Sequence, residues 1–200
     1  MSTEVSLLEM LDARERRVQH QQELFEQYHK TLLCFTMNIA GPVKDSPLIR
    51  RGFAMGRQLL RQQFLRVGLT PLHTDVCMEA TGCEAFYVLD AAPLIVKKIT
   101  AAIEDATPLG RLFDMDVLRP DGAKVDREEL HLEGRKCLIC GGPAKVCSSR
   151  RIHPVAELQA KTTALLTEAV TAWDAAQIAR QAVRAILYEV TTTPKPGLVD

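Results

Sequence analysis

The sequence predicts an α+β fold, in which a small mixed β-sheet flanked by helices is followed by a helical C-terminal segment. As far as residue 118, short runs of β-forming residues alternate with longer segments of helical periodicity. The order helix, strand, helix, two strands, helix, strand is that of an α+β or α/β plan. Beyond residue 154 the chain is rich in alanine and reads as helix. Of the 200 residues, 46% are hydrophobic, which is enough to build a core.

The first half of the chain supplies a helix, a strand and a second helix. The first helix is predicted over residues 6–28, with a packing role, and residues 31–39 follow as a short buried strand. The second helix is expected to begin at Ser46, an N-cap residue before Pro47, and to end near Gly68. The apolar face of the first helix consists of Leu7, Leu8, Leu11, Val18, Leu24 and Phe25.

The remaining sheet elements come next. Residues 73–80 and 84–91 are predicted to form a hairpin joined by residues 81–83. Pro93 opens a third helix that runs to about residue 106. The stretch PLGRLFDMDV, residues 108–117, is the last strand, and the D-G pair in the RPDGAK stretch after it predicts a turn.

Composition excludes several classes of partner. The chain has 25 basic and 25 acidic residues, which argues against a global attraction to nucleic acid or to an anionic membrane. It contains no apolar run near the roughly 20 residues that span a bilayer. The N-terminus lacks the pattern of a signal peptide, so we expect a cytoplasmic protein whose six cysteines are reduced thiols or metal ligands.

Two carboxylates, Asp114 and Asp116, stand on the last strand with a single Met between them. Residues i and i+2 of a strand point to the same face, so the two acids lie side by side while Met115 turns to the core. Paired carboxylates repel unless a cation lies between them, and oxygen ligands suit Mg²⁺ or Mn²⁺. The competing interpretation is an edge strand whose acids simply face water.

A basic loop lies in the stretch PVKDSPLIRR, residues 42–51. Lys44, Arg50 and Arg51 stand near a helix start, where free backbone N–H groups also attract phosphate. With Arg111, which leads into the acid-bearing strand, they are the candidate residues for binding a phosphate-containing substrate. An ordinary solvated turn is the alternative interpretation of the loop.

A cysteine-rich loop follows residue 135. Cys137 and Cys140 form a C-x-x-C pair, and Cys147 and His153 follow. Three thiolates and one imidazole satisfy a tetrahedral zinc site in number, although the spacing matches no standard zinc finger. The alternative is a set of plain thiols in a reducing compartment.

Four stretches carry a more specific signal when they are taken together and in order: TMNIAGPVKDSPLIRRGF, TGCEAFYVLDA, PLGRLFDMDV and RKCLICGGPAKVCSSRRIHPVAEL. Between residues 5 and 158 the chain closely resembles the citrate lyase holo-acyl-carrier-protein synthases, also called apo-citrate lyase phosphoribosyl-dephospho-CoA transferases. The resemblance implies a nucleotidyltransferase-like fold. It also implies transfer of the prosthetic group from triphosphoribosyl-dephospho-CoA to a serine of the citrate lyase acyl carrier protein, the γ subunit, with release of diphosphate.

The sequence departs from the broader nucleotidyltransferase pattern at two points. Those enzymes commonly carry a Gly-Ser or Gly-Gly pair about ten residues before the acids, and none stands at that distance here. They often add a third carboxylate on another strand. Asp75, Glu79 and Glu84 lie on or beside neighbouring strands and are the candidates for that position.

A second resemblance covers the end of the chain. The stretch AVTAWDAAQIARQAVRAILYEVTTTPKPGLVD is similar to the opening of triphosphoribosyl-dephospho-CoA synthase. We therefore expect a transferase domain over residues 1–158 and, over residues 159–200, the helical start of a truncated synthase domain. Two other functions stay open: a non-catalytic, zinc-stabilised adaptor that docks on the lyase complex, and synthase activity in an intact parent chain.

Overall fold

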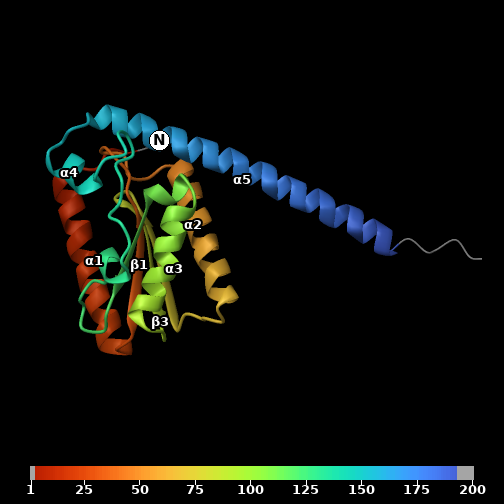
Figure 1. The fold of residues 1–200 in the computed structure, drawn as a ribbon, viewed down its shortest axis with the longest axis horizontal. Helices are drawn as coiled ribbons and strands as arrows, with labels where there is room; N and C mark the ends of the chain where they lie inside the picture. The colour runs from red at the N-terminus through yellow and green to blue at the C-terminus, as the bar shows by residue number, and fades with distance from the viewer. Residues whose placement is uncertain (1–2, 193–200) are drawn as a thin grey trace, which may run out of the picture.

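The chain folds into a four-stranded sheet with helices on both faces, followed by one long helix (Figure 1). The computed structural model describes residues 3–192, with side chains as far as residue 181. The strands are β1 (Thr31–Met37), β2 (His73–Glu79), β3 (Gly82–Leu89) and β4 (Phe113–Leu118). The helices are α1 (Leu7–Tyr28), α2 (Pro47–Arg66), α3 (Pro93–Ala106), α4 (Ala144–Ser149) and α5 (Val155–Thr192), with 3₁₀ turns η1 (Leu109–Leu112) and η2 (Arg127–Leu130).

The sheet has the strand order β2-β3-β1-β4, and every pair is antiparallel. The α+β class and the flanking helices are confirmed, but the sheet is antiparallel where a mixed sheet was expected. The helical crossovers through α2 and α3 each join strands of the same direction, and in both cases another strand lies between them. This βαββαβ order is the split, ferredoxin-like topology. The nucleotidyltransferase-like part of the expectation stays a prediction.

Two apolar layers cover the sheet. On one face α2 and α3 bury Phe53, Phe113 and Phe35, whose rings pack with centroids 4.8 Å (Phe35–Phe53) and 5.3 Å (Phe35–Phe113) apart. Gly56 makes this close approach possible, since a Cβ there would lie 2.5 Å from the Phe35 ring. On the other face Leu24 of α1 packs in a smaller cluster with apolar residues of β1, β3 and β4.

Helix α1 begins as its sequence predicts but packs differently. Ser6 and Glu9 form a capping box at its N-terminus. The predicted apolar face is wrong in its first half, because Leu7 and Leu8 are 75% and 72% exposed and Leu11 and Val18 are also exposed. The helix instead turns Arg17 toward the sheet, where its guanidinium pairs with a carboxylate of β3.

The other predicted elements agree closely with the structure. Ser46 caps α2 by accepting a hydrogen bond from the Ile49 N–H at 3.2 Å, and Pro47 occupies the first turn. Gly68 follows the helix with a φ of +67°, a left-handed conformation that glycine adopts without strain. The hairpin turn is tighter than expected, because β3 already begins at Gly82.

Helix α5 packs on the body through its first half, as far as Trp173 and Asp174. Leu165 and Leu166 belong to the core beside α2, while the later turns extend away from the sheet (Figure 1). The predicted boundary between residues 158 and 159 falls inside this helix, and the two-domain division stays a prediction. The final part of the synthase-like stretch, residues 193–200, lies outside the described residues. Within the described part of the chain, no helix has the length and apolarity needed to span a membrane.

Candidate active site and metal-binding loop

The two acids lie on β4, at one edge of the sheet. Antiparallel pairing with β1 sets Asp114 opposite Thr36 and Asp116 opposite Cys34. Met115 between them is fully buried against α2 and α3, so both carboxylates emerge on the α1 side. Their side chains are 49% and 35% exposed, which leaves the pair accessible to a ligand.

Cations already surround the acid pair. Lys124 Nζ lies 2.6 Å from Asp116 Oδ1, because the turn after β4 brings it back beside Leu118. Arg135 Nη1 lies 3.7 Å from Asp114 Oδ1. Even so, burial and then the charge of Asp116 raise the pKa of Asp114. The ionised form of Asp114 is therefore disfavoured even with Lys124 and Arg135 beside the pair.

Two buried charges of α3 hold the strand between the acids. Lys97 donates to the Met115 carbonyl at 3.3 Å, and Glu104 accepts the Met115 N–H at 2.9 Å. Both side chains are at least 95% buried. Burial raises the pKa of Glu104, while Arg127 Nη1 at 3.1 Å favours its charged form. Met115 is thus fixed from outside the sheet, and the spacing of its two acidic neighbours is fixed with it.

Two cavities open around the acids. A cavity of about 790 Å³ is lined by both carboxylates, by Lys97, Lys124 and Arg135, and by the loop before α4. A smaller one of about 160 Å³ lies on the α1 side and is lined by Asp114, Lys44, Arg14, Arg17 and Glu84. Asn38, at the end of β1, borders both. Each cavity therefore combines carboxylates with cationic groups, as a site for a metal-bound phosphate would.

Of the three candidates for a third carboxylate, Glu84 lies nearest to the acid pair in the sheet. It is paired in register with Thr36, which is itself paired with Asp114, so the three stand in one row. Arg17 binds Glu84. Glu79 instead pairs with Arg16 at 2.8 Å. Asp75 accepts from His73 at 2.7 Å and lies on the outer strand β2.

The four basic candidates are separated by the fold. Lys44 lines the smaller cavity with Asp114, donates to the Ile39 carbonyl, and has a pKa lowered by burial. Arg111 binds the Lys136 carbonyl and borders the cysteine-rich loop. Arg50 is bound by Asp45 through two contacts of 2.7 and 2.6 Å, and Arg51 by Asp174. Arg50 and Arg51 line neither of the cavities that Asp114 lines.

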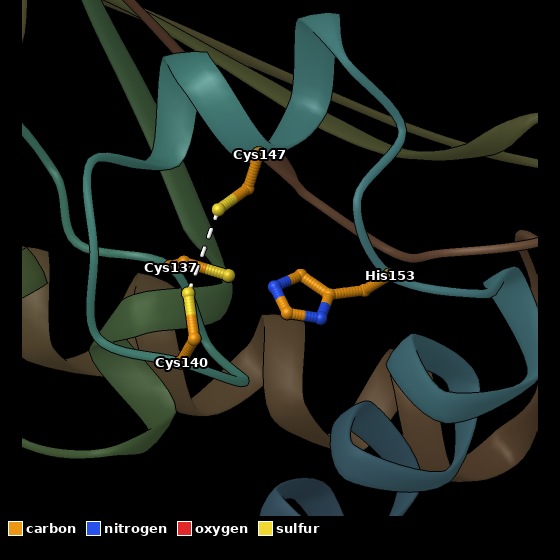
Figure 2. A group of neighbouring side chains, drawn as sticks. All are labelled: Cys137, Cys140, Cys147 and His153. Atoms are coloured by element: carbon orange, nitrogen blue, oxygen red, sulfur yellow. Dashed lines mark hydrogen bonds between the residues drawn. The ribbon is translucent and has the colours of Figure 1, made fainter.

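The predicted zinc ligands do converge (Figure 2). Cys137 and Cys140 come from the loop, Cys147 from α4 and His153 from the segment before α5, and all four side chains point to one centre. Their ligand atoms lie within 4.8 Å of one another, and the Sγ atoms of Cys140 and Cys147 are 3.5 Å apart. Zinc–sulfur bonds near 2.3 Å imply about 3.8 Å between sulfurs in a tetrahedron. The cluster could therefore hold a metal ion.

The imidazole of His153 supports this arrangement. Its Nε2 is buried and has no hydrogen-bond partner, while its Nδ1 lies 3.7 Å from Glu157 Oε2. A metal-binding histidine commonly directs one nitrogen to the ion and the other to a carboxylate. Although burial raises the pKa of the Cys137 thiol, hydrogen bonds from the Cys140 and Ile139 N–H groups lower it to about 7. The pKa of the Cys147 thiol is instead raised, chiefly by its hydrogen bond with Cys140, so Cys137 would supply the first thiolate for a metal.

Sequence reasoning missed three cations that line the larger cavity, Lys97, Lys124 and Arg135. The signal for Lys124 was the D-G turn, which folds the chain back so that the following residues return to β4. Arg135 had no local signal, because its position depends on the carbonyl groups of Gly110 and Arg111, to which it donates.

Comparisons with known proteins find relatives over most of the chain. The family model described as "Apo-citrate lyase phosphoribosyl-dephospho-CoA transferase" matches residues 5–169. The protein of that name from Citrobacter koseri is 33% identical over 165 residues, which are 82% of this chain and 90% of the relative. "Protein CitXG" of Haemophilus influenzae is 34% identical over 99% of this chain, and that of Leuconostoc mesenteroides is 31% identical over 98%. The chain spans 42% and 44% of these two longer relatives. It belongs to the apo-citrate lyase phosphoribosyl-dephospho-CoA transferase family.

Proposed function

We propose that this chain transfers the phosphoribosyl-dephospho-CoA group from its triphosphate donor to a serine of the citrate lyase acyl carrier protein. The observation that carries the proposal is the acid pair of β4 at a cavity of about 790 Å³ bordered by Lys97, Lys124 and Arg135. In this reaction the serine Oγ forms a bond to the α-phosphorus of the donor. The bond from that phosphorus to the β-phosphate oxygen breaks, diphosphate leaves, and the serine proton passes to solvent.

Asp114 and Asp116 are proposed to hold Mg²⁺ or Mn²⁺. Two carboxylates on one strand face, with the pKa of Asp114 raised by burial and by its neighbour, form a donor set that a hard cation would stabilise. Such an ion, when bound, offsets the charge of the triphosphate. Lys124 now occupies one oxygen of Asp116. The other oxygen of Asp116 and the carboxylate of Asp114 would remain for a metal, and Lys124 would lie beside the phosphates that such an ion would bind.

The cationic residues are proposed to bind and orient the phosphates. Arg135 is held over Asp114 by two backbone carbonyls, and Lys44 lines the smaller cavity on the α1 side of the same acid. The triphosphate would lie between these groups, with Lys124 beside it. Glu84 stands in the sheet row of Asp114 and is the proposed third carboxylate, reached by releasing Arg17.

The ion of the Cys/His cluster is proposed to be Zn²⁺. Three thiolates and one imidazole are the ligand set of closed, structural zinc sites. Magnesium would prefer oxygen ligands and has none in this cluster. A reducing cytoplasm, the predicted location of the protein, keeps such thiols available for metal.

A non-catalytic adaptor is the other function to exclude, and one experiment separates the two. The purified protein is incubated with triphosphoribosyl-dephospho-CoA, Mg²⁺ and the apo carrier protein, and the carrier is weighed by mass spectrometry. A gain equal to the phosphoribosyl-dephospho-CoA group supports transfer. An unmodified carrier that nevertheless binds the protein would support the adaptor.

A double variant, Asp114→Asn with Asp116→Asn, is the matched control. It should bind the carrier as the parent does but leave its mass unchanged. Excess chelator added to the parent protein should stop transfer, and Mg²⁺ should restore it. Transfer that continues in excess chelator would contradict the role of the acid pair.

A further inference from the structure

The Cys/His cluster and the acid pair are connected through one short segment, residues 135–137. At one end of this segment Arg135 faces Asp114 at 3.7 Å. At the other end Cys137 contributes a ligand atom to the cluster. Only Lys136 separates them, so the cluster and the acid cavity share one short backbone segment.

Backbone hydrogen bonds close this segment and the residues after it into a small loop. The Cys137 N–H donates to the Gly142 carbonyl at 2.6 Å, and the Ala144 N–H donates to the Arg135 carbonyl at 2.9 Å. The Gly141 N–H donates to the Cys137 carbonyl at 3.1 Å. Most residues of this loop are at least partly exposed and contribute little to the apolar core. Its shape therefore depends on these hydrogen bonds and on whatever joins the four ligands.

The loop is fastened to the acid-bearing strand by two arginines in opposite directions. Arg135 Nη2 donates to the carbonyls of Arg111 at 2.7 Å and of Gly110 at 3.4 Å. Arg111 in turn donates to the Lys136 carbonyl. Both acceptor carbonyls of Arg135 lie in η1, which leads directly into β4.

We infer that a metal ion in the Cys137, Cys140, Cys147 and His153 cluster positions Arg135 over Asp114, and so controls anion binding at the acid pair. Arg135 is a positioning and phosphate-binding residue in this scheme, and the cluster acts through it. The catalytic consequence rests on the proposed function, whereas the coupling between the two sites does not. Loss of the metal would release the loop, the Arg135–Arg111 contacts and the cationic side of the cavity together.

Hydrogen exchange tests the coupling without any measurement of catalysis. Amide exchange is followed by mass spectrometry in residues 107–114 and 135–144, for protein loaded with zinc and for protein stripped by a chelator under reducing conditions. Stripping should increase exchange at least severalfold in both segments. Arg135→Met should increase it in residues 107–114 with zinc still bound. Cys77→Ser, which changes an exposed cysteine outside the cluster, should match the parent.

Binding of inorganic diphosphate with Mg²⁺, measured by calorimetry, tests the consequence. Arg135→Met should weaken binding by about tenfold or more, as expected for one lost charge-assisted contact. Zinc removal should weaken it to a similar degree, and zinc removal from Arg135→Met should add little, because the two changes act on the same contact.

Several outcomes would overturn the inference. One is unchanged exchange of residues 107–114 after zinc removal. Another is that zinc removal weakens diphosphate binding by the same factor in Arg135→Met as in the parent, and a third is a protein that binds no metal at the cluster. Exchange that also rises throughout β1 would make the metal a global stabiliser and overturn the inference too. A parent protein that transfers the group while showing none of the coupling would keep the proposed function and reject the inference. Coupling without transfer would do the reverse.

Discussion

The acid pair and the Cys/His cluster are built from opposite kinds of structure. Asp114 and Asp116 lie on a regular strand that pairs with β1 along one edge. Along its other edge, Lys97 and Glu104 bind the backbone of Met115. The four cluster residues lie on a loop, a six-residue helix and a connecting segment with few buried side chains. We expect the backbone of the first site to keep its geometry whether or not an ion is bound. We expect the second site to depend on its ion, because little more than Leu138 and Cys147 ties its parts to the core.

The difference indicates how each site should respond to change. Removing a carboxylate from a rigid strand should remove chemistry and leave the fold intact. Removing a ligand from a loop should remove local structure, and chemistry only through it. The predictions below separate these two behaviours, in order of decreasing expected effect.

The largest effect is expected for the acid pair. Asp114→Asn combined with Asp116→Asn should reduce the transfer rate by about a thousandfold or more, since a catalytic metal contributes several kcal/mol. The rate is followed by the mass of the carrier protein, and folding by circular dichroism. Should the double variant be unfolded, the two acids would be structural and the comparison would fail.

The next effect concerns the zinc content. The parent protein should contain about one equivalent of zinc, and Cys137→Ser should lose most of it and become less stable to heat, because metal binding and local folding are coupled. Elemental analysis and thermal unfolding measure the two changes. Cys77→Ser serves as the control and should retain both the zinc and the stability of the parent.

A more moderate effect is expected for Glu157, which faces the Nδ1 of His153. Glu157→Gln should weaken zinc binding by about ten- to a hundredfold without removing a ligand, as substitutions of such supporting carboxylates do. Competition with a chelator of known affinity measures this change. Equal affinities in the parent and the variant would show that Glu157 is only a surface residue.

The basic loop provides a smaller, internally controlled effect. Lys44→Ala should raise the KM for the donor by about ten- to a hundredfold, the value of one charge-assisted contact to phosphate. Arg50→Ala should change it far less, because Arg50 is bound to Asp45 outside the cavities of the acid pair. Equal effects of the two substitutions would place the phosphate site along the start of α2 instead.

The smallest effect is on stability. The pKa of Asp114 is raised in the folded protein, so its ionised form destabilises the fold at neutral pH. Asp114→Asn should therefore raise the Tm by a few degrees at most at pH 7. The gain should disappear as the pH falls through the raised pKa to below the ordinary value of 3.8. Thermal unfolding of both proteins from pH 7 to pH 3 provides the measurement.

What could be predicted from the sequence follows the same division. The acid pair could be predicted because the period of a strand alone places Asp114 and Asp116 on one face. The start of α2 could be predicted because Ser46 is a typical N-cap residue and Pro47 suits the first turn of a helix. The four cluster residues were identified by type, but their convergence needed the fold.

Other features had no local signal. In the sheet, another strand lies between the two strands that each helical crossover joins. The sequence spacing of the strands does not determine which strand takes that place. Arg135 reaches Asp114 only through carbonyl groups more than twenty residues away along the chain. The predicted apolar face of α1 is wrong in its first half because Arg17, a charged residue, faces the sheet there, while Leu24 packs on the sheet further along the helix.

The binding of the Met115 backbone by Lys97 and Glu104 has a consequence for self-association. An edge strand with free backbone groups can recruit a strand from another molecule. On β4, Lys97 and Glu104 bind both backbone groups of Met115, and Val117 accepts from the Val125 N–H at 2.8 Å. The opposite edge, β2, pairs only with β3 among the described strands and leaves Val76 and Met78 exposed. Any aggregation of this protein through strand addition should therefore begin at β2, and the acid-bearing edge should stay out of it.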